Sequence, residues 1–555
     1  MRLVGLDWEI ICRESVFVSM LVRMKVGSCA NEACSKFFQL VASESVNRCL
    51  GFVRASLMAA VFGVGKITDA FYTVAYVEFI FVRLAARGDG VIHNSFIPMF
   101  SQRREQNGSE NAWRLSSEVF SVLLPILMVM IMVIELVLPL LVRYVMAPGF
   151  PYQSDEYFLT VQLSRVVMPS IFFISLASLV TGILFASGRY FIACMPSMVI
   201  HILPIFVLTY ALCYGSNMHK AEMIYLLCWG VFLAHAVYFW ILYLSAKKSG
   251  VELRFQYPRL TCNVKLFFKL ASPLLVTAVF VQVFFVIIRA IATREMGAVS
   301  AMQYASRIYF LPLGLIGGSM MAALLPKLSS AIQLENKQQS SELRNRAIEY
   351  VLFFGIPCTA ILLMLPKEII QTLYERGAFT AQDTILVSSY LSIYSTEIVG
   401  FLLSRVLLSE FYARNDVKTP AKFYILSIVM GFVIAIGLFP FIGGYGIATA
   451  EVSWVWVNTI CLAVALLKRR QIDLPFQTIY RILSIFISSG LMGMFIVFFK
   501  PCLFNQLSAE TAFSPFKNLA IILSGAVLVY LCSISLLLGK GFLASLKYSL
   551  KTDKG

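Results

Sequence analysis

The sequence has little charge and few histidines. Only 14% of its 555 residues are Asp, Glu, Lys or Arg, whereas 59% are hydrophobic. A soluble protein of this length needs far more charge to cover its surface, and the mean hydropathy of +0.80 points the same way. The composition therefore excludes an ordinary soluble protein and predicts a polytopic membrane protein.

The sequence also lacks the spacings of metal and catalytic motifs. Its twelve cysteines are scattered and show neither paired zinc spacing nor a secreted-type disulfide framework. No HExxH motif occurs, and the only histidines are His93, His201, His219 and His235. We therefore expect no metal, no cofactor and no catalytic residues.

Long apolar runs fill most of the chain, and each membrane span needs about 20 such residues. The hydrophobic runs predict an all-α protein with fourteen transmembrane helices, at 41–63, 69–98, 116–146, 158–187, 191–214, 222–246, 265–293, 299–328, 347–366, 385–410, 421–443, 446–467, 480–499 and 518–540.

The loops between these spans alternate in charge. One set is rich in Lys and Arg, for example SAKKSGVELRFQYPR and ARNDVKTPAK, whereas the other, for example APGFPYQSDEY and FIGGYG, is poor in them. The net charge of +16 thus follows the positive-inside rule and need not indicate nucleic acid. We expect both termini on the cytoplasmic side.

An internal repeat divides the chain. FFQL at 37–40 recurs as FFKL at 267–270, and FIPMFSQ as LLPKLSS, at an offset near 230 residues. Two six-helix halves in the same orientation are typical of transporters. We expect a dispensable extension at the start of the chain, with Met24 as a candidate initiator, and the following parts: extension 1–35, first half 36–247, linker 248–264, second half 265–470 and a final helix pair with the tail, 471–555.

Arginines lie inside the first two predicted spans. Arg48, Arg54 and Arg83 interrupt apolar runs, and a charge within a span usually faces a water-filled cavity or a partner. Arg48 and Arg54 are six residues apart, and a break at Gly51 could turn both toward one cavity. Three arginines close together predict a cationic cavity for an anionic substrate, although snorkelling or pairing with acids would also explain them.

Other charged residues permit two explanations each. Asp69, after Thr68, fits a helix-dipole role at the start of its helix, or it could position an arginine. Arg289 and Arg307 could face the same cavity from the second half, or pair with Glu397 or Glu451. Those two carboxylates, each alone in an apolar run, could instead bind a coupling cation or a proton.

Several motifs in a fixed order resemble the MurJ (MviN) lipid II flippases of bacteria. They include RCLGFVRASLMAAVFGVGKITDAFY, APGF, YERGAFTAQD and FYARNDVKTP, and the likeness runs from about residue 36 to the end. The resemblance implies the fold of the multidrug/oligosaccharidyl-lipid/polysaccharide exporter superfamily, with a tail-binding groove formed by the last two helices.

The resemblance also implies a function and a site. Such flippases move lipid II, an undecaprenyl diphosphate carrying the peptidoglycan precursor, to the outer leaflet of the bacterial inner membrane. Arg48, Arg54, Asp69 and Arg307 match functionally important family positions, and Arg83 is the nearest match to a basic position late in the second helix. Cell-wall synthesis proteins are possible partners, and the membrane potential or a monovalent ion is a possible energy source.

Three alternatives remain from the sequence. A flippase for another polyprenyl-diphosphate saccharide would need the same cationic cavity. A multidrug antiporter of the superfamily usually carries cations, which these arginines would repel. A membrane enzyme acting on lipid intermediates would need clustered carboxylates, histidines or a metal site, which the sequence does not offer.

Overall fold

Helices form nearly all of the protein that the computed structural model describes, which comprises residues 32–85, 90–215, 218–251, 253–469, 471, 473, 475–505 and 514–549. These residues contain no strand. The chain divides into two units, residues 1–300 and 301–555, and each is described by itself. The expected extension 1–35 falls almost wholly outside the described residues.

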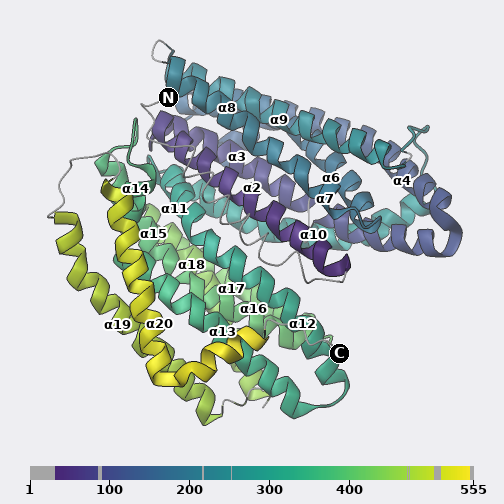
Figure 1. Cartoon of the computed structure of the whole chain (residues 1–555). Helices are drawn as coiled ribbons and strands as arrows, with labels where there is room; N and C mark the ends of the chain where they lie inside the picture. The colour runs from purple at the N-terminus through teal and green to yellow at the C-terminus, as the bar shows by residue number, and fades with distance from the viewer. Residues whose placement is uncertain are drawn as a thin grey trace. The chain divides into compact units, whose positions relative to one another are not determined.

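The first unit contains nine α-helices and two short irregular turns among its described residues, and the first residues of α11 (Figure 1). Their bounds are α2 Glu32–Phe62, α3 Lys66–Ala85, α4 Val91–Leu141, the π-turn Val142–Met146, α5 Asp155–Val167, α6 Ser170–Ala186, α7 Tyr190–Cys194, the 3-10 turn Met195–Met198, α8 Val199–Tyr214, α9 Lys220–Lys248, α10 Cys262–Ala292 and α11 Ala298–Pro312.

The second unit takes up the rest of α11 and the remaining described helices. Their bounds are the π-turn Leu313–Gly317, α12 Gly318–Gln333, α13 Lys337–Met364, α14 Pro366–Tyr374, α15 Ala381–Ser395, α16 Glu397–Ala413, α17 Lys418–Ile442, α18 Gly444–Lys468, α19 Phe476–Asn505 and α20 Ser514–Ser549. The last two, drawn in yellow, pack side by side (Figure 1).

Local sequence explains where several helices begin and turn. Ser154 and Thr261 cap α5 and α10 by accepting a hydrogen bond from the backbone N–H three residues later. Thr380 and Asp383 form a reciprocal capping box at the start of α15. Gly108 adopts φ 80° inside α4 and separates two helical stretches there, a conformation that glycine enters without steric cost.

Each of the fourteen predicted spans overlaps helix, but the count of fourteen is not confirmed. Among the described residues, ten helical stretches are long and apolar enough to cross a membrane. The predicted span 69–98 is divided, because α3 ends at Ala85 and α4 begins at Val91. The protein is therefore an all-α, multi-pass membrane protein.

The core of the first unit includes α10. A cluster of buried residues from α4, α6, α9 and α10 joins Phe96 and Phe100 to Phe267, whose ring meets that of Phe96 edge-on at 6.4 Å. The contacts group α10 with the helices before it, and they do not test the predicted linker at 248–264. The six-plus-six division therefore stays a prediction from the repeat.

The loop before α5 makes a close backbone contact with the end of α10. The Gly149 N–H donates to Thr293 Oγ1 at 3.0 Å. A Cβ added at Gly149 would lie 2.3 Å from the backbone nitrogen of Arg294 and 2.4 Å from the carbonyl carbon of Thr293. Only glycine fits at this position without moving backbone.

Candidate functional site

Arg48 and Arg54 lie on one continuous helix. α2 runs through Gly51 without interruption, so the break that we considered there is absent. The two arginines are therefore about 9 Å apart along the axis and about 120° apart around it. Both side chains are half-buried, and Gly51 is buried. Because α2 is regular here, the two guanidinium groups leave different faces of the helix.

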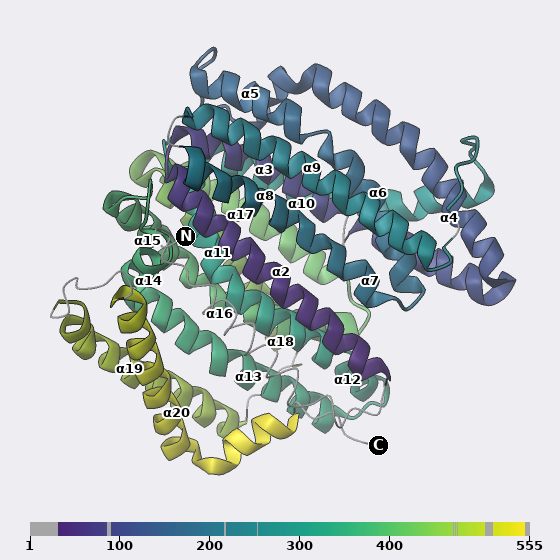
Figure 2. The ribbon, with the colours of Figure 1, turned by 45° about the horizontal axis from the view of Figure 1, so that its top comes forward.

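The position of α2 in the first unit is fixed by a polar contact as well as by packing. α2 lies along α8 and α7 (Figure 2). Asn47, which directly precedes Arg48 in the chain, is buried, and its side-chain amide donates to Ser197 Oγ at 2.7 Å. A buried side-chain hydrogen bond favours one register of a helix on its neighbours, since a shifted register leaves both groups unpaired.

Asp69 holds the start of another helix. Its side chain is 1% exposed and accepts hydrogen bonds from the backbone N–H groups of Gly297, at 2.5 Å, and Ser300, at 2.8 Å. These groups belong to the first turn of α11, which carries Arg307 two turns later. The carboxylate thus serves as an N-cap supplied from 228 residues away, and its negative charge complements the helix dipole.

The remaining predicted arginines are in different surroundings. Arg289, on α10, places its guanidinium 5.1 Å from the ring centre of Tyr76 on α3, a cation–π arrangement. Arg307 is half-buried on α11, and no carboxylate among the described residues forms an ion pair with it. Arg83 lies on α3 with its side chain outside the described part of the chain.

Glu397 and Glu451, predicted separately, come together in the second unit. Both are buried, on α16 and α18. Tyr394 donates a hydrogen bond to Glu451 Oε2 at 2.6 Å, and Tyr309 donates one to Glu397. The two tyrosine rings stack at 4.9 Å. Neighbouring buried carboxylates repel each other unless a proton or cation lies between them, and the ion-coupling role of this pair stays a prediction.

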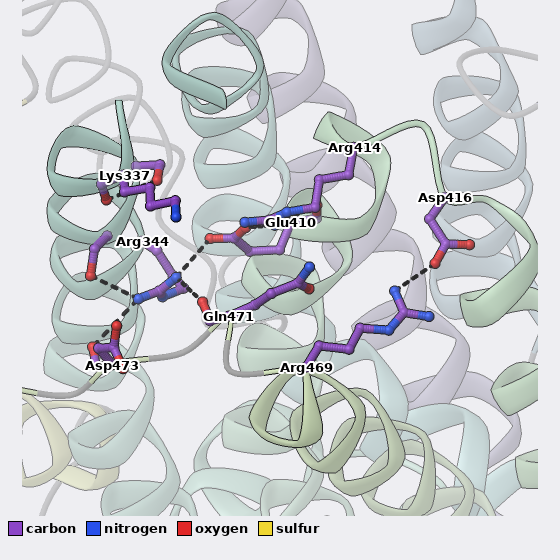
Figure 3. Close-up of polar contacts among 10 residues, drawn as sticks. Lys337, Arg344, Glu410, Arg414, Asp416, Arg469, Gln471 and Asp473 are labelled. Atoms are coloured by element: carbon purple, nitrogen blue, oxygen red, sulfur yellow. Dashed lines mark hydrogen bonds and ion pairs between the residues drawn. The ribbon is translucent and has the colours of Figure 1, made fainter. Parts of the chain in front are cut away.

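One charged cluster was missed by reasoning from the sequence. Arg344 on α13, with a side chain only 3% exposed, contacts Glu410 on α16 at 3.2 Å (Figure 3). Glu410 is fully buried and also pairs with Arg414. Arg344 further donates to the backbone carbonyls of Gln471 and Asp473, in the segment between α18 and α19. One feature of the sequence could have pointed to this cluster. Arg344 lies just before the predicted span 347–366, and Glu410 is the last residue of the predicted span 385–410.

Further contacts attach the last two helices to the second unit. Near the start of α19, Arg481 pairs with Glu349 of α13 at 3.0 Å. Near its other end, Lys500 pairs with Glu368 of α14 at 2.8 Å. These pairs attach α19 to the rest of the second unit near both of its ends.

The described residues contain no group of three or more His, Cys, Asp or Glu side chains placed to hold a metal ion. The charged groups described above are arginines and carboxylates, held within a helical membrane protein.

Comparisons with known proteins agree with this architecture. The model of the family described as lipid II flippase MurJ matches residues 58–522. A probable lipid II flippase MurJ of Rhizobium tropici is 35% identical over 463 residues, 83% of this chain and 86% of that protein. Its counterpart in Rhizobium meliloti (strain 1021) is 34% identical over 447 residues, 80% of this chain and 83% of that protein.

Solved structures show the same fold. A lipid II flippase MurJ in an inward closed conformation matches with a TM-score of 0.74 and 23% identity, over 90% of this chain and 98% of the other. An inward-facing multidrug resistance MATE transporter of the MOP superfamily matches with a TM-score of 0.62 and 15% identity, over 79% and 95%. The family model covers most of both units, and the chain therefore belongs to the MurJ family of lipid II flippases.

Proposed function

We propose that this protein translocates lipid II from the inner to the outer leaflet of the bacterial cytoplasmic membrane. The observation that carries the proposal is the match of the family model over residues 58–522, together with relatives of the same name that align over most of their length. The substrate is a lipid-linked saccharide that leaves the transporter chemically unchanged.

Arginine chemistry supports an anionic substrate headgroup. Arg48 and Arg54 on α2 and Arg307 on α11 are half-buried cations. A planar guanidinium matches the oxygens of a diphosphate with two parallel hydrogen bonds, and this attraction strengthens where water is excluded. We assign these three residues and Arg83 to the diphosphate, Asp69 to holding α11, and alternating access to the transport cycle.

Other superfamily substrates explain the residues less well. The MATE likeness is one of fold alone, at 15% identity. An exporter of organic cations would need acidic residues where this chain has arginines. A flippase for another polyprenyl-diphosphate saccharide is the remaining competitor, and the transport assay below separates it from lipid II.

The proposal also covers where the protein lies in the cell, its partners and its energy source. Basic loops place both termini in the cytoplasm of a cell whose inner membrane holds the protein. Proteins of cell-wall synthesis are its proposed partners. The membrane potential or a monovalent ion is the proposed energy source, with Glu397 and Glu451 as the carboxylates for the ion.

Complementation tests the substrate and the site together. A bacterial host is depleted of its own lipid II flippase, this chain is expressed, and lipid II exposed at the outer leaflet is measured. We expect wild type to restore exposure and Arg48→Ala, Arg54→Ala and Arg307→Ala to lose it at unchanged abundance. Arg54→Lys should also fail if two parallel hydrogen bonds are needed.

A matched control is Arg346→Ala, because the Arg346 side chain is 52% exposed and pairs only with the exposed Glu342. It should complement like wild type. Normal transport by all three alanine variants would contradict the cationic site. Failure of well-inserted wild type in several hosts, with rescue by a different polyprenyl-diphosphate saccharide, would contradict lipid II as the substrate.

A further inference from the structure

A buried acid–base pair lies inside the first unit, on helices α3 and α9. Glu78 on α3 and His235 on α9 are 6% and 3% exposed. The Nδ1 atom of His235 lies 3.2 Å from Glu78 Oε1. The Ser170 hydroxyl, on the first residue of α6, donates to the same oxygen at 3.0 Å. Three helices therefore converge on one carboxylate.

The surroundings of His235 fix one of its two ring protons. Nδ1 also lies 2.9 Å from the carbonyl oxygen of Val231, one turn earlier in α9. Both neighbours of Nδ1, the Val231 carbonyl and the Glu78 carboxylate, are hydrogen-bond acceptors. Nδ1 must therefore carry a hydrogen, and Nε2 is the atom of the ring that can gain or lose one.

Two polar groups lie against the Glu78 carboxylate. Glu78 Oε1 accepts a hydrogen bond from Ser170, and His235 Nδ1 lies 3.2 Å from the same oxygen, an ion-pair distance when the imidazole is protonated. With neutral imidazole the pair carries one negative charge, and with imidazolium it carries none. An uncompensated charge in a membrane interior is costly, so a proton at Nε2 removes a real electrostatic penalty.

Several charged groups on the neighbouring helices have partners of their own. Cys228, also on α9, lies close enough to Glu78 to interact with its charge. On α10, Arg289 faces Tyr76. On α5, the exposed Arg165 interacts with Glu135 of α4, and Glu156 pairs with Lys66.

We propose that Glu78 and His235 form a proton-binding site in the first unit, with the exchangeable proton on Nε2 of His235, and that its occupancy sets the rate of transport. Histidine commonly exchanges a proton within the physiological pH range, and intramembrane acid–base pairs serve as proton relays in transporters. The coupling part rests on the proposed flippase function, whereas the binding part does not.

Nitrogen NMR of the full chain, with ¹⁵N-labelled histidine imidazoles, tests proton binding directly. Only four histidines contribute signals, and single His→Gln variants assign them. The signals of His235 should report gain and loss of the proton at Nε2 as the pH changes. In Glu78→Gln, which keeps an acceptor oxygen of the same shape, the midpoint of this change should lie below that of wild type, because an opposite charge is lost.

Two controls separate this charge effect from a structural one. The exposed His219, at the start of α9, should titrate identically in wild type and Glu78→Gln. Ser170→Ala removes one hydrogen bond but keeps the carboxylate, so it should shift the midpoint of His235 less than Glu78→Gln does. A His235 that stays in one protonation state throughout, or the same midpoint in Glu78→Gln as in wild type, would overturn the site.

Lipid II translocation in vesicles over the same pH range tests the coupling. The rate should change around the NMR midpoint of His235, and that change should move with the midpoint in Glu78→Gln. A flat rate profile in a chain whose His235 titrates would overturn the coupling. Absence of lipid II transport at every pH would count against the proposed function, while the NMR result still decides the proton site.

Discussion

Each unit holds a connecting segment against one of its helices, but the two units do so with different chemistry. In the first, residues 253–261 dock on α4: the backbone N–H groups of Arg254 and Gln256 donate to Ser117 and Ser121, at 3.1 and 2.9 Å. In the second, residues 471 and 473 offer carbonyls to the buried guanidinium of Arg344 (Figure 3). In the repeat predicted from the sequence, the later part of α4 corresponds to α13.

The difference lies in how much each solution depends on charge. The first unit uses neutral hydroxyls and one carboxylate, Glu118, which accepts from Thr261 at 2.7 Å and Asn263 at 3.1 Å. The second unit buries Arg344 and Glu410, whose desolvation has to be offset by several contacts at once. A repeat therefore preserves the place of a contact without preserving its chemistry.

Removing Arg344 should have the largest effect. Arg344→Ala leaves Glu410 buried with one cationic partner and leaves the carbonyls of Gln471 and Asp473 without this donor. Breaking a buried ion pair on one side costs about 3–5 kcal/mol of unfolding free energy. Thermal unfolding in detergent, monitored by circular dichroism, checks this, and a melting temperature equal to that of Arg346→Ala would contradict it.

A double-mutant cycle sharpens the same comparison. If the pair acts as a unit, Arg344→Met with Glu410→Met should be less destabilising than the sum of the two single changes. Additive losses of stability would mean that Arg344 acts only through the backbone carbonyls.

Removing the Glu118 carboxylate of the first unit should have an intermediate effect on the free energy of unfolding. Glu118→Ala deletes two hydrogen bonds to a charged group that is half-buried, which are worth about 1.5–3 kcal/mol each at most. Water can reach the site and recover part of this. We expect a loss of unfolding free energy smaller than that of Arg344→Ala, measured by the same melts; a larger loss would reverse the contrast between the units.

The smallest effect should come from Arg469→Ala. Arg469 pairs with Asp416 at 2.8 Å in the loop before α17, with 40% of its side chain exposed. Such pairs contribute about 1 kcal/mol or less. The hydrogen bond from Arg469 lowers the pKa of Asp416 to about 2. The contribution is therefore complete above about pH 4 and disappears as the pH falls through 2.

Melts of wild type and Arg469→Ala at several pH values check this last prediction. The difference between the two proteins should be small and constant from pH 5 to pH 8. A difference that grows above pH 5 would assign the pair's titration to another group.

Local properties of the sequence predicted much of the fold and less of the sites. The hydrophobic runs located helices, because the ability of a stretch to span a membrane depends on the residues within that same stretch. The break considered at Gly51 is absent, since packing on α7 and α8 favours a continuous α2. The partner of Asp69 lies 228 residues away, and that of Arg344 lies 66 residues away, so no spacing rule could have paired them.

Gly149 has a consequence for how sequence motifs are used. It belongs to APGF, one of the motifs that carried the family resemblance, yet its constraint is the backbone of Thr293 and Arg294 pressed against its Cα. A saturation mutagenesis screen would score position 149 as intolerant, with the same readout as an arginine that binds the substrate. Only a measurement of how much protein reaches the membrane would separate the two, so a diagnostic motif can report assembly instead of transport.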